Sequence, residues 1–98
     1  MYFIERSGRF NKWYLNLADR QAQARIALRI KRASSGNFGM TRPVGQGVHE
    51  MKIDYGPGYR LYYARKGEVT YLLLCGGDKS SQQGDIETAI ALWHALRK

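Results

Sequence analysis

The sequence predicts an α+β fold with the element order β-α-α-β-β-β-α, an antiparallel meander sheet packed by an N-terminal helical hairpin and a C-terminal helix. Two observations predict it. Apolar residues recur every three or four positions over residues 10–33 and 86–96, which is typical of helices, whereas they alternate or form short runs over residues 48–75, which is typical of strands. With 98 residues in total, we expect one domain covering residues 1–98.

The N-terminal half begins with a short apolar and aromatic segment, residues 1–5 (MYFIE), which predicts a first strand. A first helix is indicated by apolar residues at helical spacing, namely Phe10, Trp13, Tyr14 and Leu17. Asp19 then stands where an N-cap would start a second helix that runs through Ala33. Small turn-forming residues at 34–39 (SSGNFG) end that helix.

In the C-terminal half the hydrophobic period changes from 3.6 to 2. Residues 48–55 alternate, with His49, Met51, Ile53 and Tyr55 on one face and the polar Glu50, Lys52 and Asp54 on the other. The turn Gly56-Pro57-Gly58 leads into an aromatic strand, residues 59–65 (YRLYYAR).

The next strand, residues 69–75 (VTYLLLC), is apolar on both faces and is therefore expected inside the sheet, covered on both sides. A final helix is predicted from one apolar stripe, Ile86, Ala89, Ile90, Trp93 and Leu96, which would pack on the sheet.

The chain is strongly basic. Sixteen Lys and Arg against eight Asp and Glu give a formal net charge of +8, which attracts polyanions. Nucleic acid, an acidic protein and an anionic membrane are all compatible with that charge, and so is a simple contribution to solubility. The longest apolar run, residues 71–75, is too short to span a bilayer, and the single Cys75 suits a reducing compartment. We expect a cytoplasmic protein that does not bind membranes.

Several kinds of chemistry are not supported by the residues. His49 and His94 have no second ligand at a helical or hairpin spacing, so no metal is expected. Neither a Walker A sequence nor a strand-linked GxGxxG is present, and no cofactor is expected. Cys75 ends an apolar strand and is interpreted as a small buried side chain rather than a nucleophile.

One polar cluster remains as a candidate site. Lys52 lies on the polar face of its strand beside Glu50, Arg60 lies opposite Lys52 across the turn, and Lys79 follows the next strand. Such a group could surround a phosphate. RNA cleavage by the 2′-hydroxyl needs a base, positive charge on the phosphate oxygens and an acid, which two cations and a carboxylate could supply. The alternative is an ordinary solvated sheet face.

A basic stripe is predicted on the second helix. Arg25, Arg29 and Arg32 follow i, i+4, i+7 spacing beside the apolar stripe of that helix. Together with Arg65 they are candidate RNA-binding residues. The alternative interpretation, a solvated helix face next to the core, is favoured for the stripe itself.

Four segments resemble a known family: residues 36–38 (GNF), 44–48 (VGQGV), 54–63 (DYGPGYRLYY) and 74–82 (LCGGDKSSQ). In this order they are similar to the RelE/ParE superfamily of toxins, in particular the HigB-like addiction-module killer proteins. The resemblance covers nearly the whole chain. It implies a small sheet with two N-terminal helices and a C-terminal helix. It also implies a toxin that a cognate helix-turn-helix antitoxin neutralises, that commonly cuts mRNA on the ribosome, and that contacts operator DNA only through the antitoxin.

The resemblance also implies roles for individual residues. Arg60 matches the arginine that RelE-like nucleases use on the scissile phosphate, Lys52 matches a strand lysine, and Lys79 approximates the basic position after the last strand. Two positions depart from the RelE pattern: Glu50 replaces a second strand lysine, and Ile86 stands near the position of an active-site tyrosine. The base and acid would then be other residues, such as Glu50 or Ser81, or the cleavage would be weaker.

Three functions remain open at this point. The leading hypothesis is a type II toxin that acts as a metal-independent, ribosome-dependent mRNA endoribonuclease and inhibits translation. The second is a ParE-like toxin that poisons DNA gyrase without cutting RNA. The third is a non-toxic phage nucleic-acid-binding module, which is supported only by charge and fold.

Overall fold

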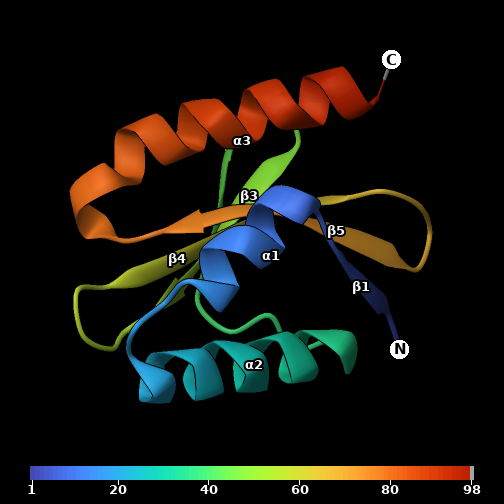
Figure 1. Cartoon of the computed structure of the whole chain (residues 1–98). Helices are drawn as coiled ribbons and strands as arrows, with labels where there is room; N and C mark the ends of the chain where they lie inside the picture. Colours follow the sequence, from blue (N-terminus) through green and yellow to red (C-terminus); the bar gives the residue numbers. More distant parts are fainter. Residues whose placement is uncertain (98) are drawn as a thin grey trace.

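Five strands form one sheet with the order β1-β5-β4-β3-β2 in the computed structural model, which describes residues 1–97 (Figure 1). The strands are β1 (Phe3–Arg6), β2 (Thr41–Gly45), β3 (Val48–Ile53), β4 (Tyr59–Arg65) and β5 (Thr70–Gly77). Strands β2 to β5 pair antiparallel in sequence order, whereas β1 pairs parallel with β5. The sheet is therefore an antiparallel meander with one parallel edge strand.

Helices cover both faces of the sheet. The helices are α1 (Gly8–Leu15), α2 (Arg20–Ser34) and α3 (Gln82–Leu96), and a short 3₁₀ helix (Lys79–Ser81) precedes α3. Figure 1 shows α3 above the sheet, α2 below it and α1 in front of the strands. Phe10 of α1 and Ile26 of α2 belong to the same core cluster, so these two helices cover the same face. The predicted N-cap at Asp19 is confirmed, because its side chain accepts hydrogen bonds from the backbone N–H groups of Gln21 and Ala22.

The predicted fold class and element order are confirmed, and the structure adds one strand. β2 was not predicted because its sequence, TRPVG, contains a proline and a glycine and has no apolar alternation. The turn that follows β2 has the geometry of a β-hairpin. Gln46 and Gly47 both have positive φ, 55° and 84°, as a two-residue type I′ hairpin turn requires.

The core is divided between the two faces of the sheet. On the α1 and α2 side Phe10, Ile26 and Leu61 are fully buried, and on the α3 side Val48, Tyr62 and Leu74 are fully buried. β4 and β5 contribute to both clusters, which confirms that the apolar strand near residues 69–75 lies inside the sheet.

Two expectations about exposure are wrong. The face that bears Glu50 is not a solvated polar face, because α3 covers it and leaves Glu50 only 3% exposed. Leu96 is 57% exposed instead of packing on the sheet. It lies one turn beyond Trp93, the last residue of α3 in the core.

Among residues 1–97, no helix combines the length and the apolar character needed to cross a membrane.

The packing of α3 leads to a first prediction. Trp93 is 7% exposed and packs in the α3-side core, so Trp93→Ala should lower the free energy of unfolding by roughly 3–5 kcal/mol. Leu96→Ala, on the same helix but largely exposed, should change it by less than about 0.5 kcal/mol. Urea unfolding of both variants measures the difference, and equal effects would contradict the packing described for α3.

Candidate functional site

A hollow of about 270 Å³ opens where β2, β3, β4 and the start of α3 meet. Its lining residues are Met40, Thr41, Arg42, Glu50, Lys52, Arg60 and Gln82. Lys52 and Arg60 are direct partners across the β3–β4 ladder, as the turn between the strands predicted. Residues that face each other in this way project from the same side of a sheet, so both cations reach one hollow.

Arg60 is buried at this hollow, with only 6% of the residue exposed, so it does not belong to an ordinary solvated sheet face. Its Nη1 donates a hydrogen bond to the carbonyl oxygen of Gly58 at 2.8 Å. Its Nε lies 3.8 Å from Oε2 of Glu50, an ion-pair distance that is too long for a hydrogen bond. Within residues 1–97 this buried N–H has no hydrogen-bond partner, so the Arg60 guanidinium keeps an unsatisfied donor beside Glu50.

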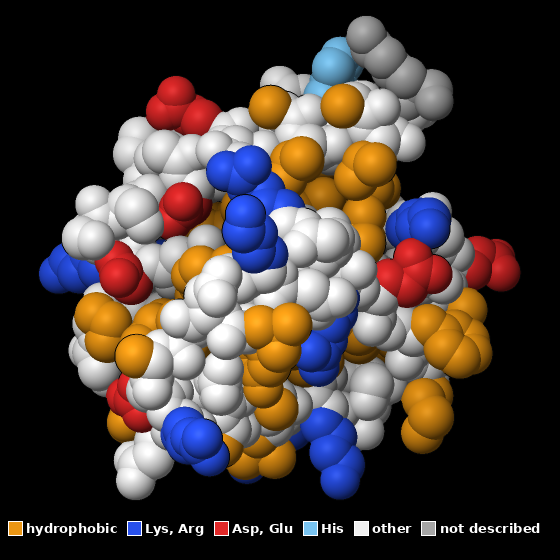
Figure 2. Space-filling view, viewed as in Figure 1, with side chains coloured by type: hydrophobic (Ala, Val, Ile, Leu, Met, Phe, Trp, Pro, Cys, Tyr) orange, Lys and Arg blue, Asp and Glu red, His pale blue; other side chains and the backbone are white. Residues whose placement is uncertain are grey.

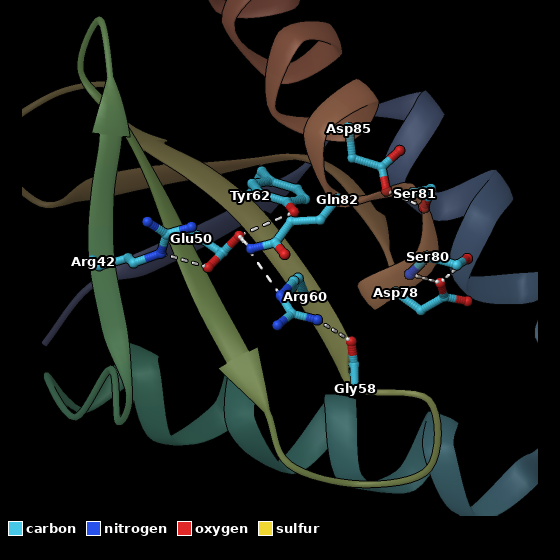
Figure 3. Close-up of polar contacts among 10 residues, drawn as sticks. All are labelled: Arg42, Glu50, Gly58, Arg60, Tyr62, Asp78, Ser80, Ser81, Gln82 and Asp85. Carbon is cyan, nitrogen blue, oxygen red and sulfur yellow. Dashed lines mark hydrogen bonds and ion pairs between the residues drawn. The ribbon is translucent and has the colours of Figure 1, made fainter.

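Glu50 is the centre of a polar network that three elements supply (Figure 3). Its Oε1 accepts from Nε of Arg42 at 2.9 Å, and its Oε2 accepts from Nε2 of Gln82 at 2.9 Å and from the hydroxyl of Tyr62 at 3.2 Å. Burial acts to raise the pKa of Glu50, but the hydrogen bonds from Arg42 and Gln82 outweigh it and hold the pKa below its usual value.

This network defines what Glu50 can do chemically. A carboxylate that is buried, ionised and already hydrogen-bonded on both oxygens is a weak proton acceptor. Its negative charge instead balances the guanidinium of Arg60, which is buried beside it. Glu50 is therefore better suited to holding Arg60 in position than to acting as a general base.

Lys79 is exposed at the start of the 3₁₀ helix and does not line the hollow of Arg60. It is nevertheless a close neighbour, because both side chains border Gly58. A β-carbon at Gly58 would lie 3.2 Å from Nη1 of Arg60 and 3.7 Å from Cβ of Lys79. The turn after β3 thus brings Lys79 next to the backbone that holds Arg60.

Asp85 is a further candidate residue that the sequence did not indicate. Its Oδ2 accepts a hydrogen bond from the hydroxyl of Ser81 at 2.5 Å. A β-carbon at Gly77 would overlap this carboxylate, and Gly77 is the direct partner of Arg60 across the β4–β5 ladder. Asp85 therefore covers the ladder partner of Arg60, but its side chain lines a different hollow, together with Arg9, Lys12 and Trp13. In the sequence, the indication of a nearby group was the glycine pair that ends β5, Gly76 and Gly77, since glycine in a strand often marks the close approach of another group.

The basic stripe of α2 borders a separate, shallower hollow of about 220 Å³, which Arg25, Arg29 and Arg32 line together with Asp54. Arg25 lies over the ring of Tyr55, with its Cζ 4.4 Å from the ring centroid, and Arg32 is exposed. Arg29 differs from both because its guanidinium donates to the carbonyl oxygens of Lys52 at 2.7 Å and Phe38 at 3.2 Å. It ties α2 to β3 and to the loop before β2.

Arg65 is not brought together with the other predicted residues. It ends β4, about 17 Å along the strand from Arg60 at about 3.3 Å per residue. Its guanidinium donates to the carbonyl oxygens of Gly67 and Glu68 and lies over the ring of Tyr71. Figure 2 likewise shows Lys and Arg side chains spread over the visible face, with hydrophobic side chains between them.

Cys75 is buried, as expected from its strand, and burial raises the pKa of its thiol to about 12. The thiol is therefore protonated at neutral pH and unsuited to nucleophilic attack.

Solved structures define the class of fold. The chain superimposes on a mutant of the Escherichia coli toxin RelE in its free state with a TM-score of 0.71 and 16% sequence identity, covering 92% of this chain and 94% of that one. The protein has the RelE-like α+β fold.

Sequence comparison then gives the family. The chain is 46% identical over 87 residues to a Haemophilus influenzae protein named only as an uncharacterized protein, and the match covers 89% of this chain and 88% of that protein. The chain belongs to the same family as this protein. No protein-family model matches the sequence.

The network predicts that loss of Glu50 lowers the free energy of unfolding more than loss of Arg42 does. Glu50→Ala should lower the free energy of unfolding by about 3–5 kcal/mol, because it leaves the buried guanidinium of Arg60 without its counter-charge. Arg42→Ala should cost about 1 kcal/mol or less, because the Arg42 side chain is 58% exposed and water can replace it. Equal losses in urea unfolding would contradict the positioning role of Glu50.

The lowered pKa of Glu50 predicts a dependence of stability on pH. The pKa of Glu50 in the folded state lies below its unfolded-state value of about 4.3. Its stabilising contribution is therefore full above that pH and declines as the pH falls through the folded-state pKa. The stability difference between wild type and Glu50→Gln should therefore be constant above about pH 5 and shrink in acid. Unfolding curves at several pH values test this, and a difference that stays constant into strong acid would contradict it.

Proposed function

We propose that this protein is the toxin of a type II toxin–antitoxin pair and acts as a metal-independent, ribosome-dependent mRNA endoribonuclease. One observation carries the proposal: on a sheet with the RelE-like fold, Gly58 and Glu50 hold the guanidinium of Arg60 at a hollow that it shares with Lys52. Positive charge that is fixed in this way is suited to an oxygen that develops negative charge.

The proposed reaction uses the 2′-hydroxyl of the RNA. The 2′-oxygen attacks phosphorus and the bond from phosphorus to the 5′-oxygen breaks, which leaves a 2′,3′-cyclic phosphate on one fragment and a 5′-hydroxyl on the other. One proton must leave the 2′-hydroxyl and one must reach the departing 5′-oxygen. Negative charge on the non-bridging oxygens grows during the attack.

Arg60 would bind the scissile phosphate, and its charge would stabilise the growing negative charge on the oxygens. The ammonium of Lys52, which shares the hollow, would donate the proton to the 5′-oxygen. Lys79 borders the same turn from outside the hollow and would hold a neighbouring phosphate.

The proton acceptor in this proposal is Asp85, either directly or through the Ser81 hydroxyl that it binds. Asp85 covers Gly77, which pairs with Arg60 across the β4–β5 ladder. Glu50 would act only by holding Arg60, since both of its oxygens already accept hydrogen bonds.

The proposed partners rest on the resemblance to HigB-like toxins and on the basic surface. A cognate helix-turn-helix antitoxin would cover the cationic hollow and carry the contact with operator DNA, as in the HigB-like branch of these toxins. The toxin itself would bind mRNA on the ribosome in the cytoplasm, where its net charge of +8 favours association with RNA.

A gyrase poison of the ParE kind is the second candidate, and one observation favours it. Ile86, near the position where RelE-like nucleases carry a tyrosine, packs against the α3-side core and brings no proton-transfer group to the hollow. A toxin that only binds its target needs no such group.

Arg60→Ala should abolish growth arrest and lower the rate of RNA cleavage by at least about a hundredfold, or about 3 kcal/mol of transition-state stabilisation. Arg60→Lys should recover little, because an ammonium lacks the planar fork that binds two phosphate oxygens. Mapping of mRNA 5′ ends in cells that express each variant measures cleavage, and thermal melting verifies that each variant folds.

Lys31→Ala is the matched control, because it removes one exposed positive charge from α2 outside both hollows. It should leave the arrest and the cleavage pattern intact. Cleavage that survives Arg60→Ala would refute the proposed site. Gyrase-dependent DNA breaks without RNA cleavage would show that the protein acts as a gyrase poison and not as a nuclease.

RNA binding should weaken as salt rises, with each phosphate contact contributing roughly −0.7 to the slope of log K against log salt for single strands. Arg32→Ala should reduce the slope by about that amount if the stripe contacts RNA. Arg29→Ala should instead destabilise the fold, because its guanidinium ties α2 to β3. Filter-binding at several salt concentrations tests this. An unchanged slope in Arg32→Ala would show that the stripe is a solvated helix face that does not contact RNA.

A further inference from the structure

A third hollow, of about 340 Å³, lies on the α2 side of the sheet and is walled largely by aromatic rings. Its lining residues are Phe38, Thr41, His49, Tyr63, Arg65 and Tyr71. The four rings, those of Phe38, His49, Tyr63 and Tyr71, are here termed the aromatic platform. They come from β3, β4, β5 and the loop before β2, so the platform spans the sheet.

The platform is built on Tyr63. This tyrosine is 4% exposed, and its hydroxyl shares a 2.6 Å hydrogen bond with the hydroxyl of Thr41. The rings of His49 and Phe38 stack on it with centroids 5.6 Å and 5.3 Å away and interplanar angles of 24° and 22°. Because Tyr63 is fixed, the half-buried His49 and Phe38 rings are held in defined orientations at the hollow.

The charge at the rim favours a nucleic acid as the occupant. Arg65 is exposed at one side, with its Cζ 5.6 Å from the ring centroid of Tyr71. Among the residues that line this hollow, none is acidic. Aromatic rings combined with an arginine are what a sheet surface uses to stack unpaired bases while it neutralises the backbone.

We propose that the aromatic platform binds an unpaired base of single-stranded RNA. This proposal rests on the proposed function and adds a second contact for the same RNA strand. Thr41 of the edge strand β2 lines both this hollow and the hollow of Arg60. A strand bound at Arg60 can therefore pass over the edge of the sheet and place a neighbouring base on the platform.

The test measures binding of a fluorescent oligoadenylate of about six nucleotides by fluorescence anisotropy. His49→Ala should weaken binding at least about fivefold, the lower end of the effect of losing one base–aromatic stack. His49→Phe keeps a flat ring and should stay within about twofold of wild type. Thermal melting of both variants checks that the half-buried position tolerates the change.

Salt separates stacking from charge. The fold-loss in His49→Ala should be the same at low and high salt, whereas the loss in Arg65→Ala should shrink as salt rises. An abasic oligonucleotide of the same length should bind wild type and His49→Ala equally, because it has no base to stack.

Three results would overturn the proposal: an unchanged affinity in His49→Ala, a loss in His49→Phe as large as that in His49→Ala, or an equal loss with the abasic strand. A His49-dependent dimer in sedimentation would likewise overturn it, because a second copy of the chain would then occupy the platform. The nuclease proposal can be refuted independently of the aromatic platform. RNA that binds through His49 but is never cut would support base binding by the platform and refute the nuclease activity.

Discussion

The ion pair between Glu50 and Arg60 is the constraint on which the rest of the site depends. A guanidinium that is 6% exposed needs a counter-charge, and the carboxylate that supplies it is itself 3% exposed. Glu50 in turn needs donors, and it finds them in Arg42 on β2, Tyr62 on β4 and Gln82 on α3. One buried pair therefore ties the edge strand, the centre of the sheet and the last helix together.

The glycines around this pair make the close packing possible. Gly58 has a φ of 80°, which favours glycine, and its carbonyl oxygen fixes Nη1 of Arg60. Gly77 leaves the space that the carboxylate of Asp85 occupies over the end of β5. Because Gly77 pairs with Arg60 across the β4–β5 ladder, the start of α3 can pack closely over this part of the sheet.

The parts of the structure that local sequence determines could be predicted. The turn at residues 56–58 set the register that pairs Lys52 with Arg60, and the Asp19 cap set the start of α2. Burial of the polar face could not be read from β3 alone, because it depends on where Gln82 and the rest of α3 come to lie. Arg42 was missed with its strand, and Asp85 was missed because only the tertiary fold brings it over Gly77.

The proposed nuclease activity requires that Arg60, held by Glu50, promotes attack of a 2′-hydroxyl on the adjacent phosphate. The most direct measurement is the chemistry of the RNA ends produced in a purified translation reaction to which the protein is added. We expect fragments with a 2′,3′-cyclic phosphate and a 5′-hydroxyl, and no cut where the 2′-hydroxyl at the cleavage position is replaced by hydrogen. Fragments that carry a 5′-phosphate, or cleavage that persists at the 2′-deoxy position, would contradict it.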